Sequence, residues 1–157
     1  MRIEGAVSLS SPVGLFAESD SSESATSTVS KSDCVDASKR SPSMDKAISL
    51  MADDMVWQNE GDNAMPWIGP WNGKDEILKF LPIFSNNFQT TAWDNTDAFA
   101  LGDTVAVFGR MNGITTHSGK EIGEFSFALR AKVRDGKVVL WNWFEDSFAV
   151  SQAYNAK

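Results

Sequence analysis

The strongest candidates for chemistry are two adjacent carboxylates, Glu145 and Asp146, which follow the aromatic run Trp141, Trp143 and Phe144. A carboxyl group placed against aromatic side chains is poorly solvated, and burial disfavours its ionised form. Its pKa should therefore rise. A carboxyl with a raised pKa can act as a general acid or base near neutral pH.

The same pair of carboxylates also has a purely structural interpretation. We expect a final helix over 147–155, and an aspartate at position 146 would be placed to accept hydrogen bonds from the free N–H groups of its first turn. Asp146 fits the acid–base role and the capping role equally well. For Glu145 the capping interpretation is favoured.

Composition limits the partners of this chain. Its 157 residues correspond to about one domain, and its 21 acidic and 14 basic residues give a net charge of -7. An acidic protein repels phosphate backbones, so we expect no nucleic-acid partner. No apolar run approaches the roughly 20 residues that a membrane-spanning helix needs, so we expect no membrane partner.

Metal and cofactor motifs are missing from the sequence. The single cysteine, Cys34, cannot form an internal disulfide, and the single histidine, His117, cannot make a histidine-rich metal site. No glycine-rich phosphate loop, zinc-protease motif or hydrolase nucleophile motif occurs. We therefore expect no metal and no cofactor. The lack of a secretory signal and the acidic residues near the start favour a cytoplasmic protein.

A change in composition divides the chain. The first 43 residues are rich in serine and hold one aromatic residue, Phe16, whereas all six tryptophans lie at position 57 or beyond. A serine-rich segment cannot bury enough apolar area to offset the entropy of ordering it. We therefore predict a disordered tail over 1–27 and a single folded domain over 28–157.

Hydrophobic periodicity predicts an α+β domain. The pattern over 28–40 is ambiguous but is compatible with a helix. Apolar spacings of three and four residues indicate helices from Ser43 to Met51 and from Lys74 to Phe88, the last of which Pro82 should kink or shorten. The glycines and prolines of 61–73 predict a loop. Strands are expected at 55–59, 90–101, 104–116, 121–134 and 137–147. The last four strands should form an antiparallel meander.

Alternation along the last two strands separates their faces. Phe125, Phe127 and Leu129 share one face of the strand 121–134. In the last strand, Trp141, Trp143 and Glu145 share one face, and the opposite face is also largely apolar. A strand that is apolar on both faces is typically covered on both sides, here by helices on one and a subunit partner or a ligand on the other.

Three segments together resemble a known family. They are ADDMVWQNEGDNAMPWIGPWNGKDEILKF, LGDTVAVFGR and VRDGKVVLWNWFEDSFAVSQAY, in this order. They resemble the SnoaL-like proteins of the nuclear transport factor 2-like superfamily, and most of all its ketosteroid-isomerase-related group. The resemblance covers about residues 44–155. It implies a cone-shaped α+β barrel, in which a curved antiparallel sheet wraps around the N-terminal helices.

The resemblance also carries expectations about function. It implies an apolar pocket at the open end of the cone and a homodimer that forms through the sheet. In the SnoaL-type cyclases an aspartate follows the glycine that begins the last strand by ten positions. Gly136 and Asp146 have this spacing, so the resemblance makes Asp146 the catalytic acid or base. Related sequences often carry a polar residue at the position that Leu129 occupies.

Two functions follow as hypotheses. The first is an isomerase, cyclase or lyase that acts on a hydrophobic small molecule through Asp146. The second is a non-catalytic ligand-binding or dimerisation module, in which Asp146 only caps a helix. For Trp67 and Trp71 the interpretation as loop anchors on the core is favoured over a ligand cage. Arg110 is the only candidate cation of the pocket. The predicted pocket residues are Trp57, Trp67, Trp71, Arg110, Phe127, Leu129, Trp143 and Phe144.

Overall fold

The computed structural model describes residues 42–157. The predicted disordered tail over 1–27, the candidate helix over 28–40 and Cys34 lie outside the described residues. The elements along the described part are α1 (Pro42–Ser49), β1 (Met51–Asn59), β2 (Gly69–Asn72), α2 (Lys74–Asn87), β3 (Phe88–Leu101), β4 (Thr104–Thr115), β5 (Lys120–Arg134), β6 (Lys137–Glu145) and α3 (Ser147–Tyr154).

The strands form one six-stranded sheet in the order β2-β1-β6-β5-β4-β3. The four long strands β3 to β6 follow one another as an antiparallel meander, as the sequence predicts. β1, however, pairs with β6 in parallel, with Trp57 opposite Trp141. The sheet is therefore mixed, and the prediction of a wholly antiparallel sheet is wrong. Short turn motifs in the sequence predict hairpins between neighbouring strands. No such motif marks the pairing of β1 with β6, because the two strands are far apart in the sequence.

The strand β2 was not predicted, because its sequence Gly-Pro-Trp-Asn has the composition of a loop. β2 is an edge strand that pairs only with β1, with Trp71 opposite Trp57. A proline is tolerated at a sheet edge, where its missing N–H breaks no ladder bond, and Pro70 occupies such a position. This short pairing brings the tryptophans of β1 and β2 together.

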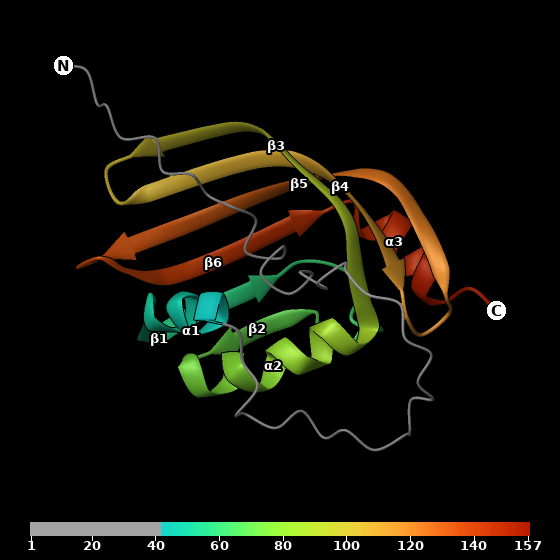
Figure 1. Cartoon of the computed structure of the whole chain (residues 1–157), viewed down its shortest axis with the longest axis horizontal. Helices are drawn as coiled ribbons and strands as arrows, with labels where there is room; N and C mark the ends of the chain where they lie inside the picture. Colours follow the sequence, from blue (N-terminus) through green and yellow to red (C-terminus); the bar gives the residue numbers. More distant parts are fainter. Residues whose placement is uncertain (1–41) are drawn as a thin grey trace, which may run out of the picture.

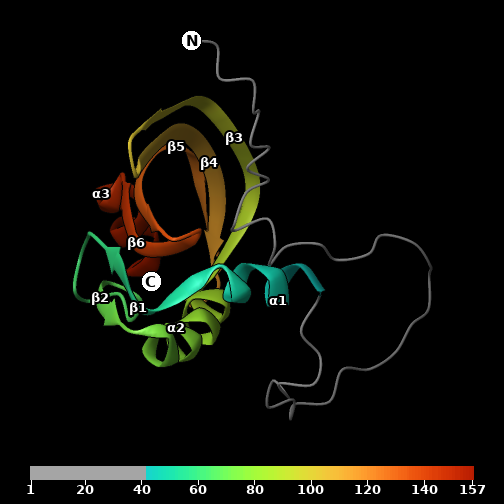
Figure 2. The same cartoon turned by 90° about the vertical axis from the view of Figure 1, so that its left-hand side faces the viewer.

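The sheet is strongly curved. Figure 2 shows β3 to β6 as a nested arch, with β1, β2 and α2 across its lower side. The helix α2 packs against β1, β2 and β3, so the inner face of the sheet lies toward this helix (Figure 1). The predicted α+β fold with a curved sheet around a helix is confirmed. The two edges, β2 and β3, do not meet, so the sheet is not a closed barrel.

Two helices differ from their predicted bounds. The helix α1 begins at Pro42 and ends at Ser49, and Met51 begins β1 instead of completing the helix. The helix α2 runs through Pro82 to Asn87, although that proline was expected to kink or shorten it. Phe88, expected at the helix end, has extended backbone and begins β3.

The core lies between α2 and the inner face of the sheet. α2 contributes Ile77 and Phe80, which are almost fully buried, and the sheet contributes Phe125 and Phe127. Burying a side chain of this size stabilises the fold by about 2–3 kcal/mol. None of the helices in the described part is both long enough and apolar enough to cross a membrane.

Candidate functional site

The inner face of β6 carries the aromatic and acidic residues that the sequence placed together. Trp143 is buried, and Glu145 follows it on the same face. The pairing register sets Phe127 of β5 directly opposite Glu145, and Gly109 of β4 opposite Phe127. The carboxyl end of β6 therefore lies beside the central strands β5 and β4, and the residues there form one site.

Three rings stack across this site. The rings of Phe127 and Trp143 are 4.8 Å apart and nearly parallel, and the ring of Trp93 lies 4.3 Å from Phe127 and 5.6 Å from Trp143, so that each ring contacts the other two. Gly109 makes this possible, because a Cβ atom there would lie only 2.4 Å from the Phe127 ring. β3, β5 and β6 thus build one continuous aromatic surface from residues far apart in the sequence.

Glu145 ends this surface. Trp143 donates its indole N–H to Glu145 Oε2 at 2.9 Å. The side chain of Glu145 is only partly exposed, and burial raises its pKa from 4.5 to about 7, with a smaller upward contribution from the charge of Asp146. The Trp143 hydrogen bond acts in the opposite direction. A carboxyl with this pKa exchanges a proton readily at neutral pH.

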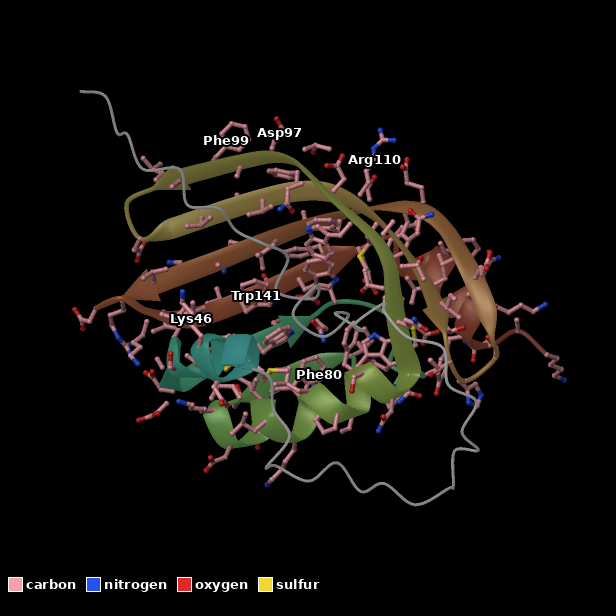
Figure 3. The ribbon with its side chains drawn as sticks, viewed as in Figure 1. Lys46, Phe80, Asp97, Phe99, Arg110 and Trp141 are labelled. Atoms are coloured by element: carbon pink, nitrogen blue, oxygen red, sulfur yellow. The ribbon has the colours of Figure 1, made fainter. Side chains whose placement is uncertain are left out.

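A second aromatic cluster continues the inner face toward β1. The rings of Trp57 and Trp141 are 5.3 Å apart, and the Phe80 ring lies 5.2 Å from both Trp57 and Trp71. Figure 3 shows Trp141 and Phe80 between β6 and α2. The three tryptophans of this cluster are only partly buried. The structure therefore brings Trp57 and Trp71, two of the predicted pocket residues, to the inner side of the fold.

Trp67 and Leu129 belong to the packed core. Trp67 is 1% exposed and its ring packs edge-on against Phe84 and Tyr154. Its backbone carbonyl accepts a hydrogen bond from the buried Asn59 side chain at 2.8 Å. These contacts agree with the loop-anchor interpretation of Trp67. Leu129 is buried on the inner face, and the sheet register places it opposite Trp143.

Asp146 is the N-cap of α3. It is exposed, and its side chain accepts a hydrogen bond from the Ala149 N–H at 3.2 Å. The capping interpretation of Asp146 is therefore confirmed. The favoured interpretation of Glu145 as a cap is wrong, because Glu145 still belongs to β6 and its carboxylate accepts from Trp143 instead.

Phe144 and Arg110, both predicted to line the pocket, lie on the outer face of the sheet. Phe144 is 42% exposed and has the opposite orientation to Trp143. Arg110 forms an exposed ion pair with Glu124 at 2.6 Å, and Figure 3 shows its side chain pointing away from the fold. The alternation of β4 buries Gly109 and Met111 and leaves the residue between them outside. The predicted inward orientation of Arg110 is therefore wrong.

Two residues of the site, Trp93 and Glu145, were absent from the predicted set. A signal for Glu145 was present in the sequence, because alternation puts it on the face of Trp141 and Trp143, whereas Asp146 falls on the other. Trp93 had no such signal, since its neighbours Phe127 and Trp143 lie on other strands. Only the sheet register shows that these three rings meet.

The structure shows no metal centre within 42–157, where no cluster of three or more potential ligands occurs. His117 is exposed in the β4–β5 turn and stacks on Tyr154 with ring centroids 4.8 Å apart. The inner face of the described residues offers the Glu145 carboxyl and aromatic surfaces, whereas the indole N–H groups of Trp57, Trp71, Trp93 and Trp143 already donate to acceptors within the fold.

Solved structures with this fold are numerous. A nuclear transport factor 2-like protein from Burkholderia thailandensis is 25% identical, with 68% of this chain and 80% of that chain covered and a TM-score of 0.59. A nuclear transport factor 2-like protein of unknown function from Burkholderia pseudomallei is 16% identical, with coverages of 72% and 86% and a TM-score of 0.65. A proposed SnoaL-like polyketide cyclase from Jannaschia is 17% identical, with coverages of 72% and 78% and a TM-score of 0.59.

No curated protein sequence matches the chain. The family model of the SnoaL-like domain, by contrast, matches residues 36–141, which is more than half of the chain. That match ends at Trp141, so the segment with Glu145 and Asp146 lies beyond it. The curved sheet, its structural neighbours and this match agree: the chain belongs to the SnoaL-like domain family and has the nuclear transport factor 2-like fold.

Proposed function

We propose that the inner face of the sheet binds an apolar small molecule and that Glu145 is its general acid or base. The observation that carries this proposal is the position of the Glu145 carboxyl at the end of the Trp93–Phe127–Trp143 stack, held by the Trp143 indole. The reaction would be of the isomerase, cyclase or lyase kind. The description of one structural neighbour as a proposed polyketide cyclase supports this class.

The geometry suggests how Glu145 would work. Because Oε2 accepts the Trp143 N–H, Oε1 is the oxygen left to meet a ligand. With a pKa of about 7, comparable amounts of the acid and the carboxylate exist at neutral pH, so the group can both take and return a proton. A ligand seated on the stacked rings would exclude water and make the carboxylate a stronger base.

Asp146 is the alternative proton carrier, because the family spacing points to it. Its exposure and its hydrogen bond to Ala149 support a structural role, whereas Glu145 has the poorly solvated environment that acid–base chemistry needs. We therefore assign the proposed proton transfer to Glu145. Asp146 provides the matched control, since it is the neighbouring carboxylate.

Proton abstraction can be tested without the natural substrate. The ring ketone 2-tetralone carries acidic protons beside its carbonyl, and NMR in D2O measures their exchange for deuterium. We expect the protein to accelerate this exchange and Glu145→Gln to remove about 100-fold or more of the acceleration, the usual range for a general base. Asp146→Asn should change the rate little, because asparagine also caps helices and the charge of Asp146 supplies only the smaller part of the rise in the Glu145 pKa. Equal loss in both variants, or none in Glu145→Gln, would contradict the assignment.

The second candidate function is binding without catalysis. The partly buried tryptophans of the Trp57–Trp71–Trp141 cluster favour it equally, because they offer an apolar surface with no titratable group among them. Quenching of tryptophan fluorescence by 2-tetralone measures binding independently of exchange. Quenching that saturates in a protein giving no exchange would support the binding module and exclude the catalytic proposal for this ligand class.

We also propose that a second copy of the chain covers the outer face of the sheet. Phe108 and Phe144 are 45% and 42% exposed there, and both flank Ala128 in the sheet register. Phe99 is 62% exposed and its ring packs edge-on against Phe108. Exposed aromatic rings gathered on one face are typical of subunit contacts.

Sedimentation measures the oligomeric state directly. We expect a dimer that Phe108→Ser converts to a monomer. Phe148→Ser changes another exposed phenylalanine, on α3 and 71% exposed, and should leave the dimer intact. A monomeric wild-type protein, or dissociation by both substitutions, would contradict a dimer formed through the outer face.

A further inference from the structure

We propose a second, separate binding site for a small anion that bears a carboxylate or phosphate group. The site is a cleft of about 350 Å³, which lies within the size range of small-molecule sites. The residues that line it come from β1, α2, β6 and the end of β5, and they are Met51, Ala52, Asp53, Asp54, Lys74, Arg134 and Lys137.

This cleft is distinct from the inner-face site. Lys137 is the first residue of β6 and Glu145 is the last, so the strand separates them by about 26 Å at roughly 3.3 Å per residue. Figure 1 shows that the start of β6, the end of β5 and the amino end of α2 lie on one side of the molecule, away from α3. None of the stacked aromatic residues lines the cleft.

An ion pair forms one wall of the cleft. Arg134 Nη2 donates to both carboxylate oxygens of Asp54, at 2.7 and 2.9 Å. This hydrogen bond, together with the opposite charge, lowers the pKa of Asp54 and raises that of Arg134, so both stay ionised. Within 42–157, Nη1 and Nε of Arg134 have no acceptor. The guanidinium therefore keeps donors that a bound anion can use.

Two lysines supply the positive charge that attracts an anion. Lys137 donates to the Ser49 carbonyl at the end of α1, which holds its ammonium group at the cleft. Lys74, at the start of α2, lines the same space. In the part of the chain that the structure describes, neither lysine pairs with a carboxylate. The cleft thus carries three positive and two negative side chains, a net +1 in a chain of net charge -7.

Asp53 and the floor of the cleft limit what can bind. Met51 and Ala52 are buried and offer an apolar base, which suits a short carbon skeleton. Asp53 is an exposed carboxylate without an ion-pair partner among the described residues, and it opposes negative charge. Its removal should therefore strengthen anion binding, whereas removal of a lysine should weaken it. A bound anion therefore requires that the two kinds of substitution change the affinity in opposite directions.

Backbone amide shifts in NMR test this proposal on the full chain. Sodium phosphate and sodium acetate are titrated separately, with sodium chloride used to hold ionic strength constant, so that the two arms distinguish phosphate from carboxylate. We expect saturable shifts around residues 53, 74 and 137 in at least one arm. Lys74→Gln should weaken binding about fivefold, the upper range for an exposed ion pair. Asp53→Asn should strengthen it by a similar factor.

Lys79→Gln is the matched control, because Lys79 is exposed on the same helix and does not line the cleft. It makes the same change in net charge and should leave the affinity unchanged. Equal weakening by Lys74→Gln and Lys79→Gln would show a nonspecific charge effect and overturn the proposal. Absence of saturable shifts with both anions would overturn it too.

Discussion

Trp143 donates its indole N–H to the carboxylate of Glu145, two residues further along the same face of β6, at 2.9 Å. The same indole stacks on Phe127, so one side chain both packs against the aromatic platform and orients the carboxyl at its edge. The carboxyl is thereby fixed in a poorly solvated position, and its pKa of about 7 follows from that position.

Glu145 should make the stability of the fold depend on pH. Its carboxyl titrates near 4.5 in the unfolded chain and near 7 in the folded one. Between these values the native state binds one proton more, so the free energy of unfolding falls as pH rises. The stabilisation is complete below pH 4.5 and is lost by about pH 7. The total change is about 3 kcal/mol at 1.36 kcal/mol per pKa unit.

Urea denaturation at pH 5 and pH 8 measures this change. Glu145→Gln has no titrating group at the position and should lose the corresponding slope, so its stability relative to the wild type should rise with pH. Asp146→Asn should keep most of the slope, because it removes only the smaller, charge-based part of the rise in the Glu145 pKa. A wild-type protein whose stability rises between pH 5 and pH 7 through Glu145 would contradict the direction that burial implies.

Trp143→Phe should raise the pKa of Glu145 still further. The substitution keeps an aromatic ring against Phe127 but removes the N–H that favours the ionised carboxylate. We also expect a loss of about 1.5–3 kcal/mol in stability above pH 7, where a hydrogen bond to a charged group is broken. A carbon-13 NMR titration of the Glu145 carboxyl measures the pKa.

Trp141→Phe is the control for this experiment. Trp141 lies on the same face of β6 two residues earlier, and within 42–157 no side chain accepts from its indole N–H. The same substitution there should leave the Glu145 titration unchanged. Equal shifts in both variants would show that general loosening of the aromatic surface, and not the hydrogen bond, controls the pKa.

Most of the fold could be predicted because its signals are local. The Asp135-Gly136 turn joins β5 to β6, and alternation sorts Phe125, Phe127 and Leu129 to one face. The parallel pairing of β1 with β6 could not be predicted in this way, because it joins segments about 80 residues apart with no turn between them. The sequence predicts a loop at β2, because adjacent glycine and proline residues such as Gly69 and Pro70 are typical of loops. The same residues are also tolerated in an edge strand, so composition does not distinguish the two.

The site was harder to predict than the fold, because one residue of strand register decides which carboxyl lies inside. Family spacing pointed to Asp146, whereas the alternation of β6 points to Glu145. Which carboxyl lies on the inner face depends on the residue at which β6 ends and α3 begins. The ends of helices and strands are the features that are hardest to predict from a sequence. Trp93 lay beyond local reasoning altogether, since bulges in β3 shift its register against β4.

Removal of the Asp146 cap should destabilise α3 and lower the Glu145 pKa only slightly, because burial is the main cause of the raised pKa and the charge of Asp146 a smaller one. Asp146→Ala deletes the acceptor for the Ala149 N–H and should cost about 1 kcal/mol, whereas Asp146→Asn should cost only a few tenths. Urea denaturation at pH 8 compares the two variants. Equal losses would show that the charge of Asp146, and not its capping hydrogen bond, stabilises this end of the chain.

Gly109 should be intolerant of any side chain, because the Phe127 ring occupies the space where a Cβ atom would lie. A Cβ at Gly109 would come within 2.2 Å of the Asp94 carbonyl oxygen and 2.4 Å of the Phe127 ring. Gly109→Ala should therefore displace that ring from Trp93 and Trp143 and destabilise the fold by about 1–3 kcal/mol.

Gly123→Ala, on β5 with open space around it, supplies the control and should change stability by less than about 0.5 kcal/mol. Near-ultraviolet circular dichroism reports the stacked indoles directly. A Gly109→Ala variant with the wild-type spectrum and stability would contradict the packing of Phe127 over this glycine, and with it the aromatic platform on which Glu145 stands.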